Sequence, residues 1–142
     1  MEGKEKPKRI VIVEDSQEIR EIYEMKLQSG GYEVLTAKDG ELGESLIKKE
    51  RPDLVLLDIM LPKKDGYDIM KDMKTGGAGE IPVIVISNLS SKEDALEAKK
   101  LGAVDYFIKA DLTPADVLWK VDMFFKNNKP NSLIKFPNPP AL

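Results

Sequence analysis

A few charged or hydroxylated side chains stand directly after runs of apolar residues, and these are the groups that could do chemistry. They are Glu14, Asp15, Asp58, Ser87 and Lys109. Asp58 ends the run Leu-Val-Leu-Leu, and a continuous apolar run bounded by turn signals is typical of a strand buried on both faces of a parallel sheet. Open α/β sheets keep their sites at the carboxyl ends of such strands. Asp58 is therefore either a structural cap or a reactive carboxylate.

The composition narrows the chemistry that these groups could perform. The chain has no cysteine and no histidine, which excludes thiol catalysis and disulfides and removes the commonest general base and zinc ligand. Carboxylates, hydroxyls, lysines and a hard cation that prefers oxygen ligands remain. The 142 residues fit one globular domain, and the net charge of -3 gives no reason to expect direct nucleic-acid binding. We expect no signal peptide and no membrane span, and absence of cysteine is compatible with a cytoplasmic protein.

Strands and helices are expected to alternate along the chain. The apolar runs predict strands at residues 9–13, 32–37, 54–57, 81–86 and 104–108. Helical spacing predicts helices after Asp15, at residues 40–49, 67–74 and 91–101, and after Thr113. Asp15 is expected to cap the first helix, and residues 76–79 are expected to form a flexible break.

This alternation predicts a parallel, doubly wound α/β sheet with right-handed crossovers and helices on both faces. In such a sheet the five groups named first come to one edge. Independent structural caps are not expected to produce this coincidence of chemically matched groups, so we expect a functional site there.

With these residues in place, the chain resembles the receiver domain of bacterial two-component response regulators, of the single-domain, chemotaxis-regulator-like kind. The resemblance rests on the five strand-end groups in order and on the run Asp-Ile-Met-Leu-Pro-x-x-Asp-Gly at residues 58–66. It implies a flavodoxin-like five-stranded sheet with strand order 2-1-3-4-5. The expected organisation is a disordered segment at 1–7, a receiver domain at 8–127 and a proline-rich tail at 128–142.

The resemblance implies that Asp58 is the phosphorylation site. Its carboxylate would accept a phosphoryl group from a histidine kinase, a histidine phosphotransfer protein or a small acyl phosphate. Glu14, Asp15 and Asp58 would repel one another by about 3 kcal/mol per pair at about 5 Å and an effective dielectric of roughly 20. Mg²⁺ would relieve this, bound by Asp15, Asp58 and the backbone carbonyl of Met60, with Glu14 acting mainly through water. The alternatives are a helix cap for Asp15 and a solvated surface charge for Glu14.

The resemblance gives three further residues a role in phosphoryl transfer and switching. Lys109 would pair with Asp58 and stabilise the charge that develops during transfer. Ser87 would hydrogen-bond a phosphoryl oxygen, and Tyr106 would turn inward when Ser87 moves. The alternatives are a solvated lysine, a turn-forming serine and an ordinary half-buried strand tyrosine.

The sequence departs from the family pattern beside two of these residues. Ala110 stands where a proline joined by a cis peptide usually follows the lysine, so the loop is either trans and differently shaped or strained. Asn88 stands where a small residue is usual, and it would narrow access to Asp58 or donate an extra hydrogen bond. Met60 and Leu89 occupy positions that tune phosphoryl lifetime in the family, and both being apolar predicts slow self-dephosphorylation.

The last helix carries a candidate partner surface at Trp119 and Met123, opposite its core stripe. This surface would hold a downstream protein target or a second copy of the chain, or else be covered by Leu133, Ile134 and Phe136 of the tail. No DNA-binding module is expected in the tail, so the chain is either a single-domain regulator acting by protein contact or an excised receiver.

Two other functional readings remain. The first is a receiver-like scaffold that binds partners without phosphorylation. The second is a magnesium-dependent phosphohydrolase of the haloacid-dehalogenase kind, which needs a second aspartate at the position of Met60. The leading expectation is a phosphorylation-activated switch and not an enzyme, apart from self-phosphotransfer and autodephosphorylation.

Overall fold

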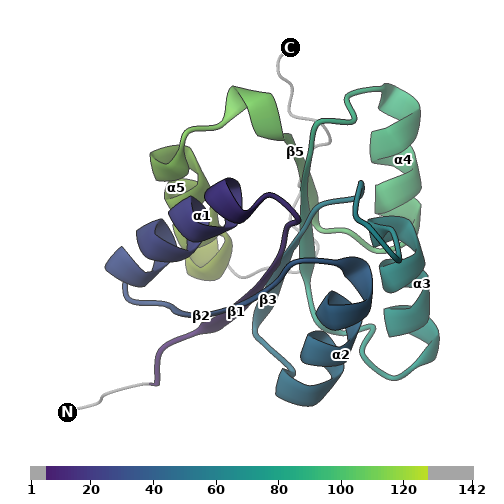
Figure 1. The fold of residues 1–142 in the computed structure, drawn as a ribbon, viewed down its shortest axis with the longest axis horizontal. Coiled ribbons are helices and arrows are strands. Elements are labelled where there is room, and N and C mark those ends of the chain that lie inside the picture. Colours follow the sequence, from purple (N-terminus) through teal and green to yellow (C-terminus); the bar gives the residue numbers. More distant parts are fainter. Residues whose placement is uncertain (1–5, 128–142) are drawn as a thin grey trace.

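A computed structural model of the chain describes residues 6–127 and forms a central sheet with helices on both faces (Figure 1). The strands are β1 (Arg9–Val13), β2 (Glu33–Ala37), β3 (Leu54–Leu57), β4 (Val83–Ser87) and β5 (Asp105–Ile108). They are all parallel and follow the order β2-β1-β3-β4-β5, as expected. Residues 1–5 of the expected disordered segment and the whole expected tail lie outside the described residues.

The helices divide between the two faces of the sheet. They are α1 (Gln17–Ser29), α2 (Gly40–Glu50), α3 (Gly66–Thr75), α4 (Lys92–Lys100) and α5 (Pro114–Asn127). A short 3-10 turn, η1 (Lys109–Asp111), joins β5 to α5. Figure 1 shows α1 and α5 together on one side of the sheet and α2, α3 and α4 on the other.

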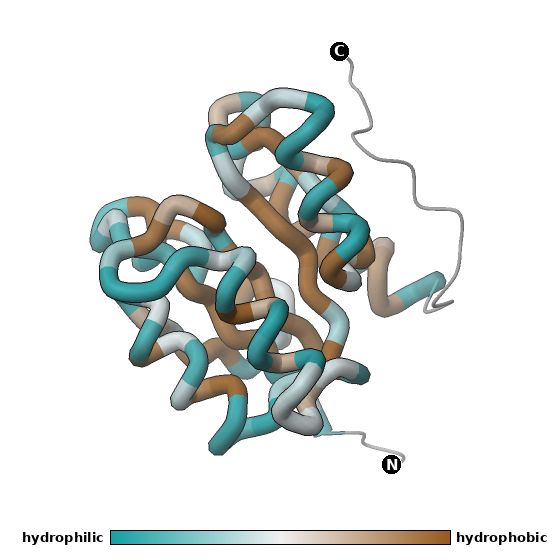
Figure 2. Tube along the Cα trace, turned by 90° about the vertical axis from the view of Figure 1, so that its right-hand side faces the viewer, coloured by the Kyte–Doolittle hydropathy of each residue, from teal (hydrophilic) through white to brown (hydrophobic). Residues whose placement is uncertain are grey.

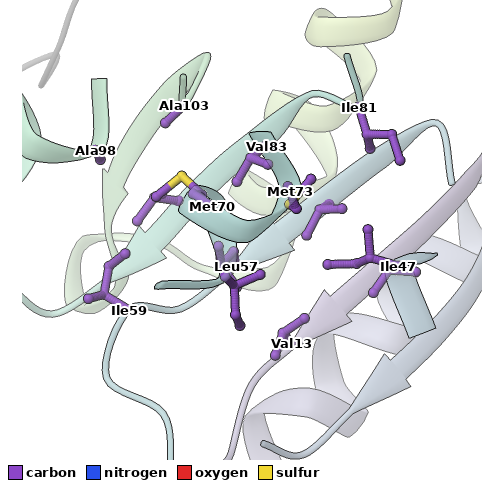
Figure 3. Packing of buried hydrophobic residues seen from close by; sticks show 14 of the residues in the cluster. Val13, Ile47, Leu57, Ile59, Met70, Met73, Ile81, Val83, Ala98 and Ala103 are labelled. Atoms are coloured by element: carbon purple, nitrogen blue, oxygen red, sulfur yellow. The ribbon is translucent and has the colours of Figure 1, made fainter. Parts of the chain in front are cut away.

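Two apolar clusters hold these layers together because neighbouring strand residues point to opposite faces. One cluster joins strand residues such as Val13, Leu57 and Val83 to α2, α3 and α4, and Figure 3 shows Met70 and Met73 of α3 packed there. The other cluster joins the alternate strand residues to α1 and α5. The strands are hydrophobic along most of their length in Figure 2, as expected for a sheet buried on both sides.

Two local predictions are wrong. Asp15 does not cap α1, because Ser16 has the extended cap conformation and its hydroxyl accepts a hydrogen bond from Ile19 N–H at 3.3 Å. Residues 76–79 form a packed turn and not a flexible break. Ala78 is buried in the core there, and its N–H donates to the Met73 carbonyl at 2.9 Å. By contrast, the predicted capping box of Ser91 and Asp94 at the start of α4 is confirmed.

The loop after β3 lies directly on the first residue of α2. Gly40 N–H donates to the Pro62 carbonyl at 3.1 Å, and a Cβ atom added at Gly40 would lie 1.7 Å from the Lys64 carbonyl oxygen. Only glycine allows the two backbones to approach so closely. This contact sets where the loop that follows Asp58 runs.

We therefore expect Gly40→Ala to destabilise the protein by about 3 kcal/mol, although alanine is normally the better helix residue, because the clash is with backbone. The free energy of unfolding in urea measures this. Gly79→Ala is the control, since its added Cβ would meet Lys74 only at 3.4 Å or more. Equal stability of the two variants would contradict the close-contact argument.

Candidate functional site

The strand register brings the five predicted groups to one edge of the sheet. Val13 pairs with Leu57, so Glu14 and Asp58 follow at the same level, and Asp58 N–H donates to the Val13 carbonyl at 3.1 Å. Ser87 is the last residue of β4 and pairs with Ile108, so Lys109 follows directly beyond it. The structure therefore places these groups at the same edge of the sheet, where the sequence predicts them.

Lys109 bridges two buried carboxylates. Its Nζ lies 2.6 Å from Asp58 Oδ2 and 2.9 Å from Glu14 Oε1. The Lys109 side chain is 12% exposed and the two acidic side chains are 4% exposed. A solvated lysine and a solvated surface Glu14, the two bland alternatives, are therefore both wrong.

Burial and pairing act in opposite directions on this ion pair. Burial lowers the pKa of Lys109, but its hydrogen bonds to Asp58 and Glu14 outweigh this, and the Lys109 pKa is raised. Burial raises the pKa of Glu14, against the opposing effects of Lys109 and of the Ser16 N–H, which donates to Glu14 Oε2 at 2.9 Å. Lys109 is thus a firmly charged ammonium at neutral pH.

The acidic groups form a cluster that one ammonium cannot neutralise. Glu14, Asp15 and Asp58 each offer a carboxylate oxygen, and these oxygens lie within 4.8 Å of one another. Asp15 is exposed at the mouth while the other two are buried. The donors are all oxygens and their charge exceeds that of Lys109, so the residues fit a hard divalent cation such as Mg²⁺. Met60 lies beside them, since its N–H donates to Asp58 Oδ1 at 3.2 Å.

Ser87 and Tyr106 meet at the backbone of Leu89. The Ser87 hydroxyl oxygen accepts from Leu89 N–H at 3.3 Å, and the Tyr106 hydroxyl donates to the Leu89 carbonyl at 2.7 Å. Ser87 is fully buried and Tyr106 is 1% exposed, so the alternative of a half-buried tyrosine is wrong. Burial raises the pKa of the Tyr106 phenol. The ring already lies inward in this structure.

The two departures from the family pattern contact each other. The described residues contain no cis peptide bond, so the Lys109–Ala110 bond is trans. Ala110 N–H donates to Asn88 Oδ1 at 3.0 Å. The extra hydrogen bond expected of Asn88 exists, but the side chain accepts it instead of donating it.

Arg20 is a contributor that the sequence reasoning missed. Its Nη1 donates to the Glu14 carbonyl at 2.8 Å and holds the loop between β1 and α1. The sequence signal that could have pointed to Arg20 is its position in α1, shortly after the acidic pair Glu14 and Asp15. The predicted partner residues lie elsewhere, on α5, where Trp119 is 59% exposed and Met123 is partly buried.

Comparison with known proteins identifies the family. The response regulator receiver domain matches residues 10–120. The chain belongs to this family. The chain is 37% identical over 132 residues to the "probable transcriptional regulator ycf27" of Porphyridium aerugineum. The aligned region covers 87% of this chain and 54% of that protein. The chain thus spans about half the length of the curated relatives it matches.

Solved structures agree with this assignment. A Francisella response regulator receiver domain has a TM-score of 0.78 and 26% identity, covering 86% of this chain and 99% of that one. The BeF3-activated receiver domain of Klebsiella pneumoniae RstA has a TM-score of 0.73 and 34% identity, covering 81% and 96%. These relatives are regulators and receiver domains. Among residues 6–127, no helix is long and apolar enough to cross a membrane.

Removing the ammonium should leave the acidic cluster without its counter-charge. We expect Lys109→Met to lower the free energy of unfolding in EDTA by about 3 kcal/mol, because two buried carboxylates lose their partner. Addition of Mg²⁺ should restore part of this loss. Urea unfolding with and without the cation measures both effects.

The control is Lys71→Met, which removes an exposed pair with Asp68 at 3.8 Å and should change stability little. Asp58→Asn should leave the free energy of unfolding unchanged or raise it. The substitution removes one of the repelling negative charges, and Lys109 still pairs with Glu14. A larger loss of unfolding free energy in Asp58→Asn than in Lys109→Met would contradict this account of the site.

Proposed function

We propose that this receiver domain is a phosphorylation-controlled switch in which Asp58 accepts a phosphoryl group. A bond forms between an Asp58 oxygen and phosphorus, while the bond from phosphorus to the donor's nitrogen or oxygen breaks and its electron pair leaves with the donor. The donor is the phosphohistidine of a kinase or phosphotransfer protein, or a small acyl phosphate. The observation that carries this is the 2.6 Å contact of Lys109 with Asp58 at the edge of the sheet.

Each surrounding group has a part in this step. Lys109 stabilises the negative charge on the phosphoryl oxygens and pairs with the Asp58 carboxylate. Asp15, Asp58 and the Met60 carbonyl would hold Mg²⁺, with Glu14 nearby, and the ion would further neutralise that charge. Ser87 hydrogen-bonds a phosphoryl oxygen, and its movement is transmitted to Tyr106 through Leu89, which both residues contact.

We further propose that the output is a protein contact on the face formed by α4, β5 and α5. The exposed Trp119 on α5 and Leu96 on α4 support this, since both are large apolar side chains. Lys120 Nζ lies 4.2 Å from the Phe107 ring of β5 and 5.5 Å from the Trp119 ring, which adds a positive charge to this face. The occupant is a downstream target or a second copy of the chain. The tail residues that would cover the face lie outside the described residues.

Incubation with acetyl phosphate tests the switch directly. Intact-mass analysis should record the gain of one phosphoryl group that requires Mg²⁺ and is lost in Asp58→Asn. The control is Asp68→Asn on α3, which removes an exposed carboxylate that pairs with Lys71 and should keep the gain. Failure of the folded wild type to gain mass, with either acetyl phosphate or a phosphorylated histidine donor, would favour a scaffold without phosphorylation.

The aspartyl phosphate should be long-lived in the isolated protein. Met60 and Leu89 line one groove of about 530 Å³ beside the site, which also includes Asp15 and Asp65. The apolar side chains of Met60 and Leu89 cannot orient a water for attack, so we expect a half-life of minutes or longer. Phosphoryl loss after removal of the donor measures it.

Met60→Asn should shorten that half-life, because the amide can hydrogen-bond a water beside the phosphoryl group. Leu96→Asn makes the same change on the exposed face of α4 and should leave the half-life unchanged. A wild-type half-life of seconds would refute the argument from the groove.

A further inference from the structure

One side chain joins the two segments that carry Ser87 and Lys109. Asn88 directly follows Ser87, Ala110 directly follows Lys109, and the Ala110 N–H donates to Asn88 Oδ1 at 3.0 Å. The backbone pairing of β4 with β5 ends at Ser87 and Ile108. The Asn88 side chain therefore continues the link between these segments beyond the end of the sheet.

This link depends on both residue types at once. Alanine at position 110 has a backbone N–H group that can donate, whereas proline at this position has none. Asn88 supplies a carbonyl oxygen on a short side chain, which an alanine or glycine would lack. The two residues therefore act as a pair, because the hydrogen bond forms only when position 110 has an N–H and position 88 has a side-chain acceptor.

Lys109 is held from both sides by these contacts. Before it, Ile108 is fixed by the sheet; after it, Ala110 is fixed by Asn88. The η1 turn adds a local bond from Leu112 N–H to the Lys109 carbonyl at 3.1 Å. With its backbone fixed in this way, the Lys109 side chain reaches Asp58 and Glu14 at hydrogen-bonding distance.

We propose that Asn88 is a positioning residue: through Ala110 N–H it holds Lys109 on Asp58 and couples the Ser87 segment to the Lys109 turn. The kinetic part of this inference rests on the proposed phosphotransfer. Asn88 lies between Ser87 and Leu89, whose backbone contacts both the Ser87 hydroxyl and Tyr106. A phosphoryl group that draws Ser87 towards Asp58 therefore also pulls on Ala110.

The first test is on the unphosphorylated protein and needs no phosphotransfer. Asn88→Leu keeps the approximate shape of the side chain but removes the acceptor. In NMR spectra we expect the Ala110 amide proton to move upfield and to exchange faster with solvent. The Lys109 Cε signal should shift towards its value in Asp58→Asn. Ser90→Ala, an exposed change in the same loop, should move neither signal.

The second test is kinetic. The maximal rate of phosphoryl uptake from acetyl phosphate at saturating Mg²⁺ should fall about three- to tenfold in Asn88→Leu, as one solvent-exposed hydrogen bond would give. The half-saturating donor concentration should stay the same. Asn88→Asp keeps the acceptor and should restore most of the rate. Ala110→Pro removes the donor, so adding it to Asn88→Leu should cause no further loss.

The outcomes separate this inference from the proposed function. An unchanged Ala110 amide, or an unchanged Lys109 Cε signal in Asn88→Leu, overturns the positioning role whether or not the protein is phosphorylated. A full uptake rate in Asn88→Leu also overturns it. Absence of uptake in the wild type overturns the phosphotransfer, while the NMR signals still decide whether Asn88 positions Lys109.

Discussion

The Lys109 ammonium lies between two carboxylates that are almost fully buried, Asp58 and Glu14, and the rest of the site depends on this ion pair. A buried carboxylate without a counter-charge costs several kcal/mol and tends to take up a proton instead. Lys109 supplies that counter-charge to both groups. The exposed Asp15 then leaves an excess of negative charge at the mouth of the site, which favours a divalent cation there.

The sheet fixes the geometry of that ion pair. Asp58 and Glu14 extend neighbouring parallel strands at the same level, and Lys109 extends β5 two strands away from Asp58. The three central strands β1, β3 and β4 are buried on both faces, so a slip of β3 by one residue would exchange its two apolar sets and turn Asp58 to the other side. Packing in the two apolar clusters therefore fixes the strand register, and the register in turn fixes the distance between Lys109 and Asp58. The apolar packing is therefore what makes the charged contact reproducible.

Much of this arrangement could be predicted from sequence because buried parallel strands are continuous apolar runs. The residue that ends each run was therefore easy to identify, and Asp58, Ser87 and Lys109 came together as expected. The Asp15 cap was wrong because Ser16, the next residue, is an equally good cap, and only the backbone angles decide between them. The direct Glu14–Lys109 contact was also missed, since it depends on side-chain conformations between residues 95 positions apart.

The bond between Asn88 and Ala110 was missed for a related reason. Each residue alone departs from the family pattern, but nothing in the sequence shows that a side chain at one position faces the N–H of the other. Where two unusual residues lie at the ends of neighbouring strands, the strand register is the information needed to connect them. Here that register is the pairing of Ser87 with Ile108.

The segment from Ser87 to Leu89 is the point at which these contacts converge. Ser87 and Tyr106 both bond the backbone of Leu89, and Asn88 bonds Ala110. The Tyr106 hydroxyl sits on a buried side chain, so losing its acceptor would cost about 1–3 kcal/mol. Tyr106 and the Leu89 carbonyl therefore tend to stay together, and a displacement of Ser87 is resisted until all three contacts change. A segment held in this way favours two discrete arrangements over a graded series, and this is the property that a switch requires.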